Sequence, residues 1–162
     1  MNEEVSLTLH DCELIDPCFP SSTVAVEFVD CIFKSSTISS CWESGKVKTL
    51  VFLGGEFPHN FQLNLSRFPA LENIVFFGLA LTNEMCNELE NTSTLKFVSL
   101  SRVRGVDREF AQRLAEMSGI KRLDLLNCID SDGRELMQFD GDYRCELRFK
   151  LSKKDDQFVR FR

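Results

Sequence analysis

Histidine is scarce in this chain, which contains only His10 and His59 among 162 residues. Imidazole is the side chain that enzymes use most often for general acid–base catalysis. The sequence also shows no phosphate-binding loop, no Ser-His-Asp candidate and no pattern of paired carboxylates. We therefore expect a protein that is not an enzyme.

Cys-x-x-Cys pairs are absent as well, although the chain contains seven Cys. Zinc is held by four nitrogen or sulfur ligands in a tetrahedral arrangement. The nearest approach to such a set is His10, Asp11 and Cys12 with Cys31 one unit away, and no paired-Cys spacing supports it. We expect neither a metal nor a cofactor, and we expect Cys12 and Cys31 to be small buried residues at the corner where a strand meets a loop.

Long apolar runs are missing too. No stretch approaches the ~20 apolar residues of a membrane-spanning helix, and no basic segment followed by an apolar run stands near residue 1. These absences predict a cytoplasmic protein without a membrane partner. The net charge of −6 also argues against general nucleic-acid binding. That charge is uneven, with eight acids and one base in residues 1–43 but seven bases and three acids in residues 144–162.

What the chain does contain is a repeat. Seven segments each hold two apolar residues separated by one position, and most follow one another at about two dozen residues. The first apolar column consists of Leu7, Val26, Leu50, Ile74, Val98, Leu123 and Leu147. The second column consists of Leu9, Phe28, Phe52, Phe76, Leu100, Leu125 and Phe149. A period of this length indicates stacked structural units, and proteins built in this way usually bind other molecules.

The central units carry further apolar positions around this pair, so that residues 71–81 read LxxLxLxxLxL with Ile and Phe among the apolar residues. This pattern resembles the leucine-rich repeat family over nearly the whole chain. At the fifth position after the first column, where that family often has Asn, the chain has Cys, Gly, Leu or Val, which is closer to the cysteine-containing subtype. The resemblance implies an α/β fold: a short leucine-rich-repeat solenoid with a parallel sheet of about seven strands and short helices on its convex side.

The units are not equally regular, although they predict one domain over residues 1–162. We expect regular repeats over residues 47–130, atypical N-terminal repeats over 1–46 and closing strands over 143–162, arranged as a β-hairpin. Terminal repeats are commonly atypical because one of their sides lacks a neighbour.

Two segments are predicted to be helical. Residues 81–95 and 106–120 align without a gap, with Thr82 and Asp107 in position to act as N-caps. The matching stretch of the preceding unit lies between Pro58 and Pro69, so we expect a shorter or irregular element there. A parallel β-helix is the alternative fold, and it would require strands where these two helices are predicted.

A candidate binding surface follows from strand alternation. Side chains between the column positions are expected to point outward on the concave face of the sheet. In the middle units these residues are apolar, and an exposed apolar patch usually marks an interaction site. The predicted surface, with its charged rim, consists of Val29, Val51, Leu53, Val75, Phe77, Phe97, Arg122, Asp124, Leu126 and Arg148.

The predicted function is therefore that of a non-enzymatic module that binds another protein through its concave sheet. One alternative is a self-assembling structural protein that uses the apolar concave face or the open ends of the solenoid. Another is an enzyme or sensor that acts through its cysteines. The sequence identifies no particular partner.

Overall fold

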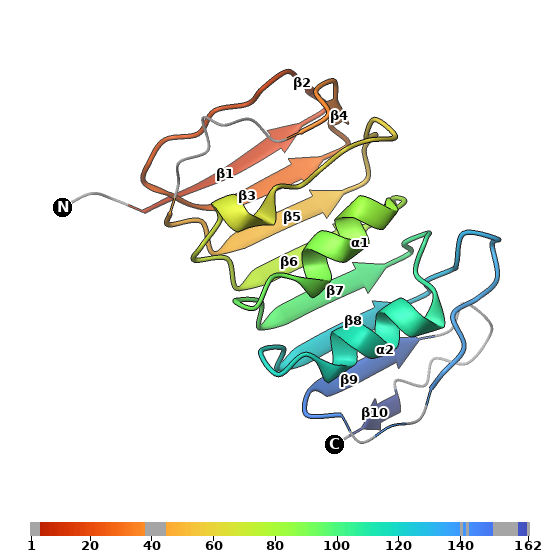
Figure 1. Cartoon of the computed structure of the whole chain (residues 1–162). Coiled ribbons are helices and arrows are strands. Elements are labelled where there is room, and N and C mark those ends of the chain that lie inside the picture. The colour runs from red at the N-terminus through yellow and green to blue at the C-terminus, as the bar shows by residue number, and fades with distance from the viewer. Residues whose placement is uncertain (1–3, 38–44, 140, 142, 151–158, 162) are drawn as a thin grey trace.

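The computed structural model describes residues 4–37, 45–139, 141, 143–150 and 159–161. The fold is α/β, with one large sheet, a two-stranded sheet and two α-helices (Figure 1). The seven parallel strands of the large sheet are β1 (Val5–His10), β3 (Thr23–Val29), β5 (Thr49–Leu53), β6 (Asn73–Phe77), β7 (Phe97–Ser101), β8 (Arg122–Leu126) and β9 (Glu146–Lys150). An eighth strand, β10 (Val159–Phe161), is antiparallel to β9.

The order of strands in the sheet follows their order in the chain. Each strand pairs with the next at the same position of the repeat, as Leu50 does with Ile74 and Phe52 with Phe76. Both predicted columns therefore run as unbroken ladders from β1 to β9. The predicted parallel sheet of about seven strands is confirmed.

The column residues form the core on one side of this sheet. From β3 to β9 every column side chain is buried, whereas Leu7 and Leu9 are half-buried because β1 is an edge strand. Three rings of the second column stack: the Phe28 and Phe52 centroids lie 5.0 Å apart, and those of Phe52 and Phe76 lie 5.1 Å apart. These rings lie face to face because they occupy the same position in successive paired strands, and adjacent strands are about 4.8 Å apart.

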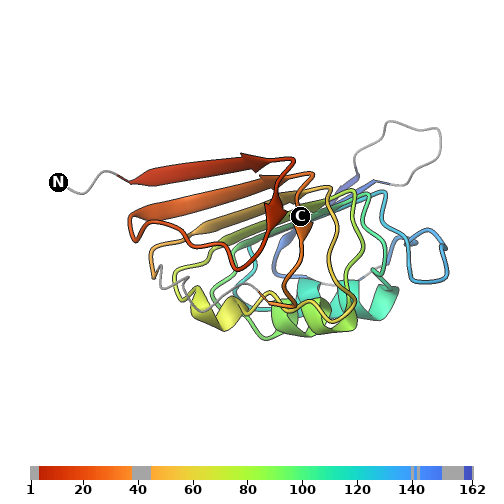
Figure 2. The same cartoon turned by 90° about the horizontal axis from the view of Figure 1, so that it is seen from above.

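Two helices cover the core from the side opposite the sheet (Figure 2). They are α1 (Asn83–Glu90) and α2 (Arg108–Glu116), close to the predicted positions. The predicted caps are confirmed, because the Thr82 hydroxyl accepts the N–H of Met85 and the Asp107 carboxylate accepts the N–H of Phe110. The β-helix alternative requires strands in these two segments, where the structure has helices.

The unit between β5 and β6 has no α-helix in this layer. It contains only a 3₁₀ turn, η1 (Leu65–Arg67), as the flanking prolines predicted. The first unit is shorter still, and there the short strand β2 (Glu13–Leu14) pairs in parallel with β4 (Ile32–Phe33) of the next unit. At the other end β9 and β10 form the predicted closing pair, although residues 151–158 between them lie outside the described part, as do 38–44 in the N-terminal repeats.

Candidate interaction surface: the open face of the sheet

We call the face of the sheet opposite α1 and α2 the open face, because no described helix lies over it (Figure 2). Its outward side chains form three rows that cross the strands. The start row is Ser6, Ala25, Thr49, Asn73, Phe97, Arg122 and Glu146. The middle row is Thr8, Glu27, Val51, Val75, Ser99, Asp124 and Arg148. The end row is His10, Val29, Leu53, Phe77, Ser101, Leu126 and Lys150.

The predicted apolar residues come together at the centre of this face. Val29, Leu53 and Phe77 are successive partners in the end row, and Val51 pairs with Val75 in the middle row. All of them keep part of their surface accessible, and Phe77 is the most notable at 39% exposed. This contiguous group of five side chains is called the apolar patch below.

The other two predicted apolar residues lie apart from this group. Phe97 is in the start row on β7, and Leu126 is in the end row on β8, where Ser101 separates it from Phe77. Ser101 and its neighbour Ser99 are small, and Ser99 is only 8% exposed. The two serines therefore form a low strip between the apolar patch and β8.

Two arginines lie against the aromatic rings of this face. The Arg102 guanidinium is 5.6 Å from the Phe77 ring centroid, and that of Arg122 is 5.0 Å from the Phe97 ring centroid. Cation–π contacts of this kind contribute about 0.5–1 kcal/mol at exposed sites. They orient the two rings, and Phe77 still remains exposed.

The charged rim differs from the prediction at one residue. Asp124 is expected to be exposed, yet it is only 5% exposed. The physical reason is Arg122, two residues away on the same face, which donates from Nε and Nη2 to the two carboxylate oxygens of Asp124 at 2.9 and 2.7 Å. This hydrogen bond raises the pKa of Arg122 above its ordinary value. Arg148 makes a similar contact with Glu146, at 3.0 Å, but remains partly exposed.

The strands end in a row of left-handed residues that carries charge along the edge of the open face. Their φ angles lie between 50° and 68°. The backbone N–H of each donates to the carbonyl oxygen of the last residue of the next strand. This corner row consists of Asp11, Asp30, Gly54, Gly78, Arg102 and Asn127. Asp and Asn tolerate this conformation better than most residues, and Gly adopts it freely.

Charge on the open face consequently changes sign from one end to the other. Acids lie at the N-terminal strands, with Glu27 in the middle row and Asp11 and Asp30 in the corner row. At the C-terminal strands the bases outnumber the acids: Arg102, Arg122, Arg148 and Lys150 stand against Asp124 and Glu146. The apolar patch lies between an acidic and a basic end.

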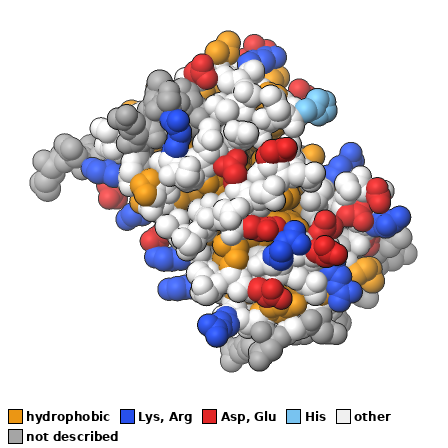
Figure 3. Space-filling model, viewed as in Figure 1, with side chains coloured by type: hydrophobic (Ala, Val, Ile, Leu, Met, Phe, Trp, Pro, Cys, Tyr) orange, Lys and Arg blue, Asp and Glu red, His pale blue; other side chains and the backbone are white. Residues whose placement is uncertain are grey.

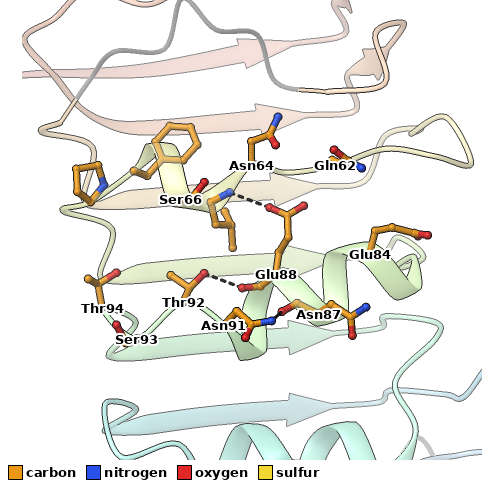
Figure 4. Close-up of a pocket in the computed structure, with 13 residues that line it drawn as sticks. Gln62, Asn64, Ser66, Glu84, Asn87, Glu88, Asn91, Thr92, Ser93 and Thr94 are labelled. Carbon is orange, nitrogen blue, oxygen red and sulfur yellow. Dashed lines mark hydrogen bonds between the residues drawn. The ribbon is translucent and has the colours of Figure 1, made fainter.

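The helix side of the molecule carries interspersed acidic and basic side chains (Figure 3), and a cleft opens on this side. This cleft of about 560 Å³ lies between η1 and α1 (Figure 4). Its α1 wall is polar, and the Glu88 carboxylate accepts the backbone N–H groups of Leu63 and Leu65 at 2.7 and 2.8 Å. The cleft exists because the unit of η1 has no α-helix beside α1. Pro58 and Pro69 predicted the missing helix, but the cleft that results from it was not predicted.

The described cysteines are mostly packed against backbone. Cys31 and Cys128 are buried, and their thiols donate to the carbonyl oxygens of Leu9 and Leu100 at 3.3 and 3.2 Å. Burial raises the pKa of Cys128 to about 11 and that of Cys86 to about 12. Neutral thiols of this kind are poor nucleophiles.

The metal candidate noted in the sequence stays without structural support: among the described residues, no three His, Cys, Asp or Glu side chains are grouped so as to hold a metal ion. Within the same part of the chain, neither helix has the length and apolar character needed to cross a bilayer. Comparisons with protein-family models, with curated proteins and with solved structures find no match for this chain.

Proposed function

We propose that the chain is a short leucine-rich-repeat-like solenoid that binds a protein partner through the open face of its sheet. The repeat length, the two in-register apolar columns and the outer helices support the solenoid interpretation. The binding interpretation depends on one observation above all, which is the contiguous apolar patch on a face that no described helix covers.

The cost of leaving this patch in water supports a binding role. Burial of apolar surface is worth about 25 cal/mol per Å². Valine, leucine and phenylalanine at adjacent outward positions of a sheet gain this free energy only when another surface covers them. The flanking charges would set the orientation of the partner, because charge complementarity steers association and selects among partners. Phe77 has the features of an anchor residue, since it is aromatic, central and exposed.

The test compares the wild-type chain with the double variant Leu53→Asp/Phe77→Asp. A matched control changes two exposed apolar residues that lie off the open face, Ile15→Asp and Met137→Asp, which are 72% and 63% exposed. The three immobilised proteins are incubated with an extract of the source cells, and the bound proteins are quantified by mass spectrometry.

We expect at least one protein to be retained by the wild type and the control but lost from the open-face variant by tenfold or more. That protein, once purified, should bind the wild type in solution with the same discrimination. Equal retention by the open-face variant and the control would refute the proposal. Circular dichroism of all three proteins checks that the substitutions leave the fold intact.

A further inference from the structure

The distribution of charge and shape on the open face identifies a partner of a particular kind. We propose that a second copy of this chain binds the open face, in a two-fold symmetric dimer whose axis runs parallel to the strands between β6 and β7. This inference rests on the proposed function in using the same surface, and it adds the identity of the occupant.

The charge gradient selects the direction of the axis. A two-fold axis parallel to the strands turns the second copy over and reverses the order of its strands, so its basic end lies over the acidic end of the first copy. An axis across the strands would instead place the acidic end over its own equivalent, with Glu27 facing Glu27. Opposite charges across an interface favour association, whereas like charges oppose it. Of these two arrangements, only the first is self-complementary.

The position of the axis follows from the strand order. The large sheet has eight strands, and its centre lies between the fourth, β6, and the fifth, β7. An axis at this centre gives the greatest overlap of the two sheets. It places β3 over β9 of the second copy, β5 over β8, and β6 over β7.

This arrangement brings complementary residues together in the middle row and in the end row. Glu27 and Arg148 share the middle row on β3 and β9, so each lies over the other. Leu53 and Leu126 share the end row on β5 and β8, so these two apolar side chains also lie over each other. A Glu–Arg pair forms twice in the dimer because the interface is isologous.

The sizes of the facing side chains are also complementary near the two-fold axis. The exposed Phe77 on β6 lies over Ser101 on β7 of the second copy, since both belong to the end row. Ser99 and Ser101 have small side chains, so they oppose the ring with little bulk. Symmetry repeats this contact, so that both Phe77 rings face a strip of small side chains.

The size of the face places the proposed dimer among weak, reversible interfaces. Eight strands about 4.8 Å apart and about five residues long cover roughly 34 Å by 16 Å, or about 550 Å² of footprint. A stable interface typically buries about 800 Å² on each partner. We therefore expect a reversible dimer with a dissociation constant in the micromolar range, about 1–100 µM.

The experiment measures mass in solution by sedimentation velocity and light scattering. The wild-type mass should rise with concentration from 18.6 kDa towards twice that value and stop there. Glu27→Lys alone and Arg148→Glu alone should each weaken the dimer by tenfold or more. An equimolar mixture of these two variants should dimerise again. In the mixed dimer the introduced lysine faces the introduced glutamate at one contact, and the unchanged Arg148 faces the unchanged Glu27 at the other.

The matched controls reverse the charge of two exposed residues on α2, in the variants Arg108→Glu and Glu116→Lys. They should dimerise like the wild type. Phe77→Ser is a second and milder test, which should weaken the dimer at least fivefold without introducing charge, and it applies if a charge-reversed variant fails to fold.

Three results would overturn the inference. They are a wild type that stays monomeric at several hundred micromolar, assembly beyond a dimer, and a mixture of the two charge-reversed variants that fails to associate. A monomer that still captures a different protein through the open face would refute the self-pairing and leave the proposed function standing.

Discussion

The alternation of buried and outward residues on β6 can be tested at two neighbouring phenylalanines. Phe76 has no exposed surface, and its ring stacks on Phe52 at 5.1 Å with an interplanar angle of 10°. Phe77 points to the open face and is 39% exposed. Phe76→Ala and Phe77→Ala remove the same atoms from consecutive positions, so composition is identical between the two variants.

The expected losses differ because only one substitution leaves a cavity. A buried Phe covers ~150–250 Å², and at about 25 cal/mol per Å² its burial is worth roughly 4–6 kcal/mol. Measured truncations of buried Phe cost about 3–5 kcal/mol, which we take for Phe76→Ala. At Phe77 water fills the space, and the loss is part of the burial plus the Arg102 contact, so we expect about 1–2 kcal/mol.

Urea unfolding followed by circular dichroism measures both values. For a chain of this size, 1 kcal/mol corresponds to about 2–4 °C in melting temperature, so Phe76→Ala should melt ~6–20 °C below the wild type. The two variants should keep the wild-type denaturant slope, which shows that the same surface unfolds. Equal shifts for Phe76→Ala and Phe77→Ala would refute the assignment of inward and outward positions on β6.

Three further predictions concern other parts of the fold. Gly55 has φ +94°, and a Cβ there would overlap a carbonyl oxygen of the preceding unit, so Gly55→Ala should cost about 2–4 kcal/mol of unfolding free energy. Gly133→Ala should cost about 1 kcal/mol, because φ is +81° but no atom lies within 4 Å, and equal costs at both sites would contradict the clash. With a maleimide under native conditions, peptide mapping should find the exposed Cys18 labelled and the buried Cys128 protected, and rapid labelling of Cys128 before unfolding would show that its site is open. Glu88→Gln should cost about 1–3 kcal/mol in thermal or urea unfolding, since the amide cannot accept both backbone N–H groups, and an unchanged midpoint would contradict their role.

The sequence was sufficient for the register of the sheet. In a stack of parallel strands the paired neighbour of a residue lies one repeat away in the sequence. The repeat length therefore predicts directly that Leu50 pairs with Ile74. The helix starts were equally accessible, because an N-cap such as Thr82 or Asp107 acts on a backbone N–H only three residues along the chain. The apolar patch was also predicted, because side chains alternate between the two faces of a strand.

The sequence did not predict how side chains share the surface. Asp124 was expected in an exposed rim, and its burial depends on the conformation that Arg122 adopts between Asp124 and the Phe97 ring. Long side chains have many rotamers of similar energy in an isolated strand, and only their packed neighbours select one.

The tertiary structure also decided where the surface is hollow. The cleft beside α1 exists because two units with different second halves stand side by side, one with a helix and one with the 3₁₀ turn η1. Prolines and caps determine each of those halves locally, whereas the space between them depends on the distance at which the sheet holds them. The same holds for the open face: alternation determined which residues point outward, and the pairing of eight strands decided that an acidic end, an apolar patch and a basic end form one continuous surface.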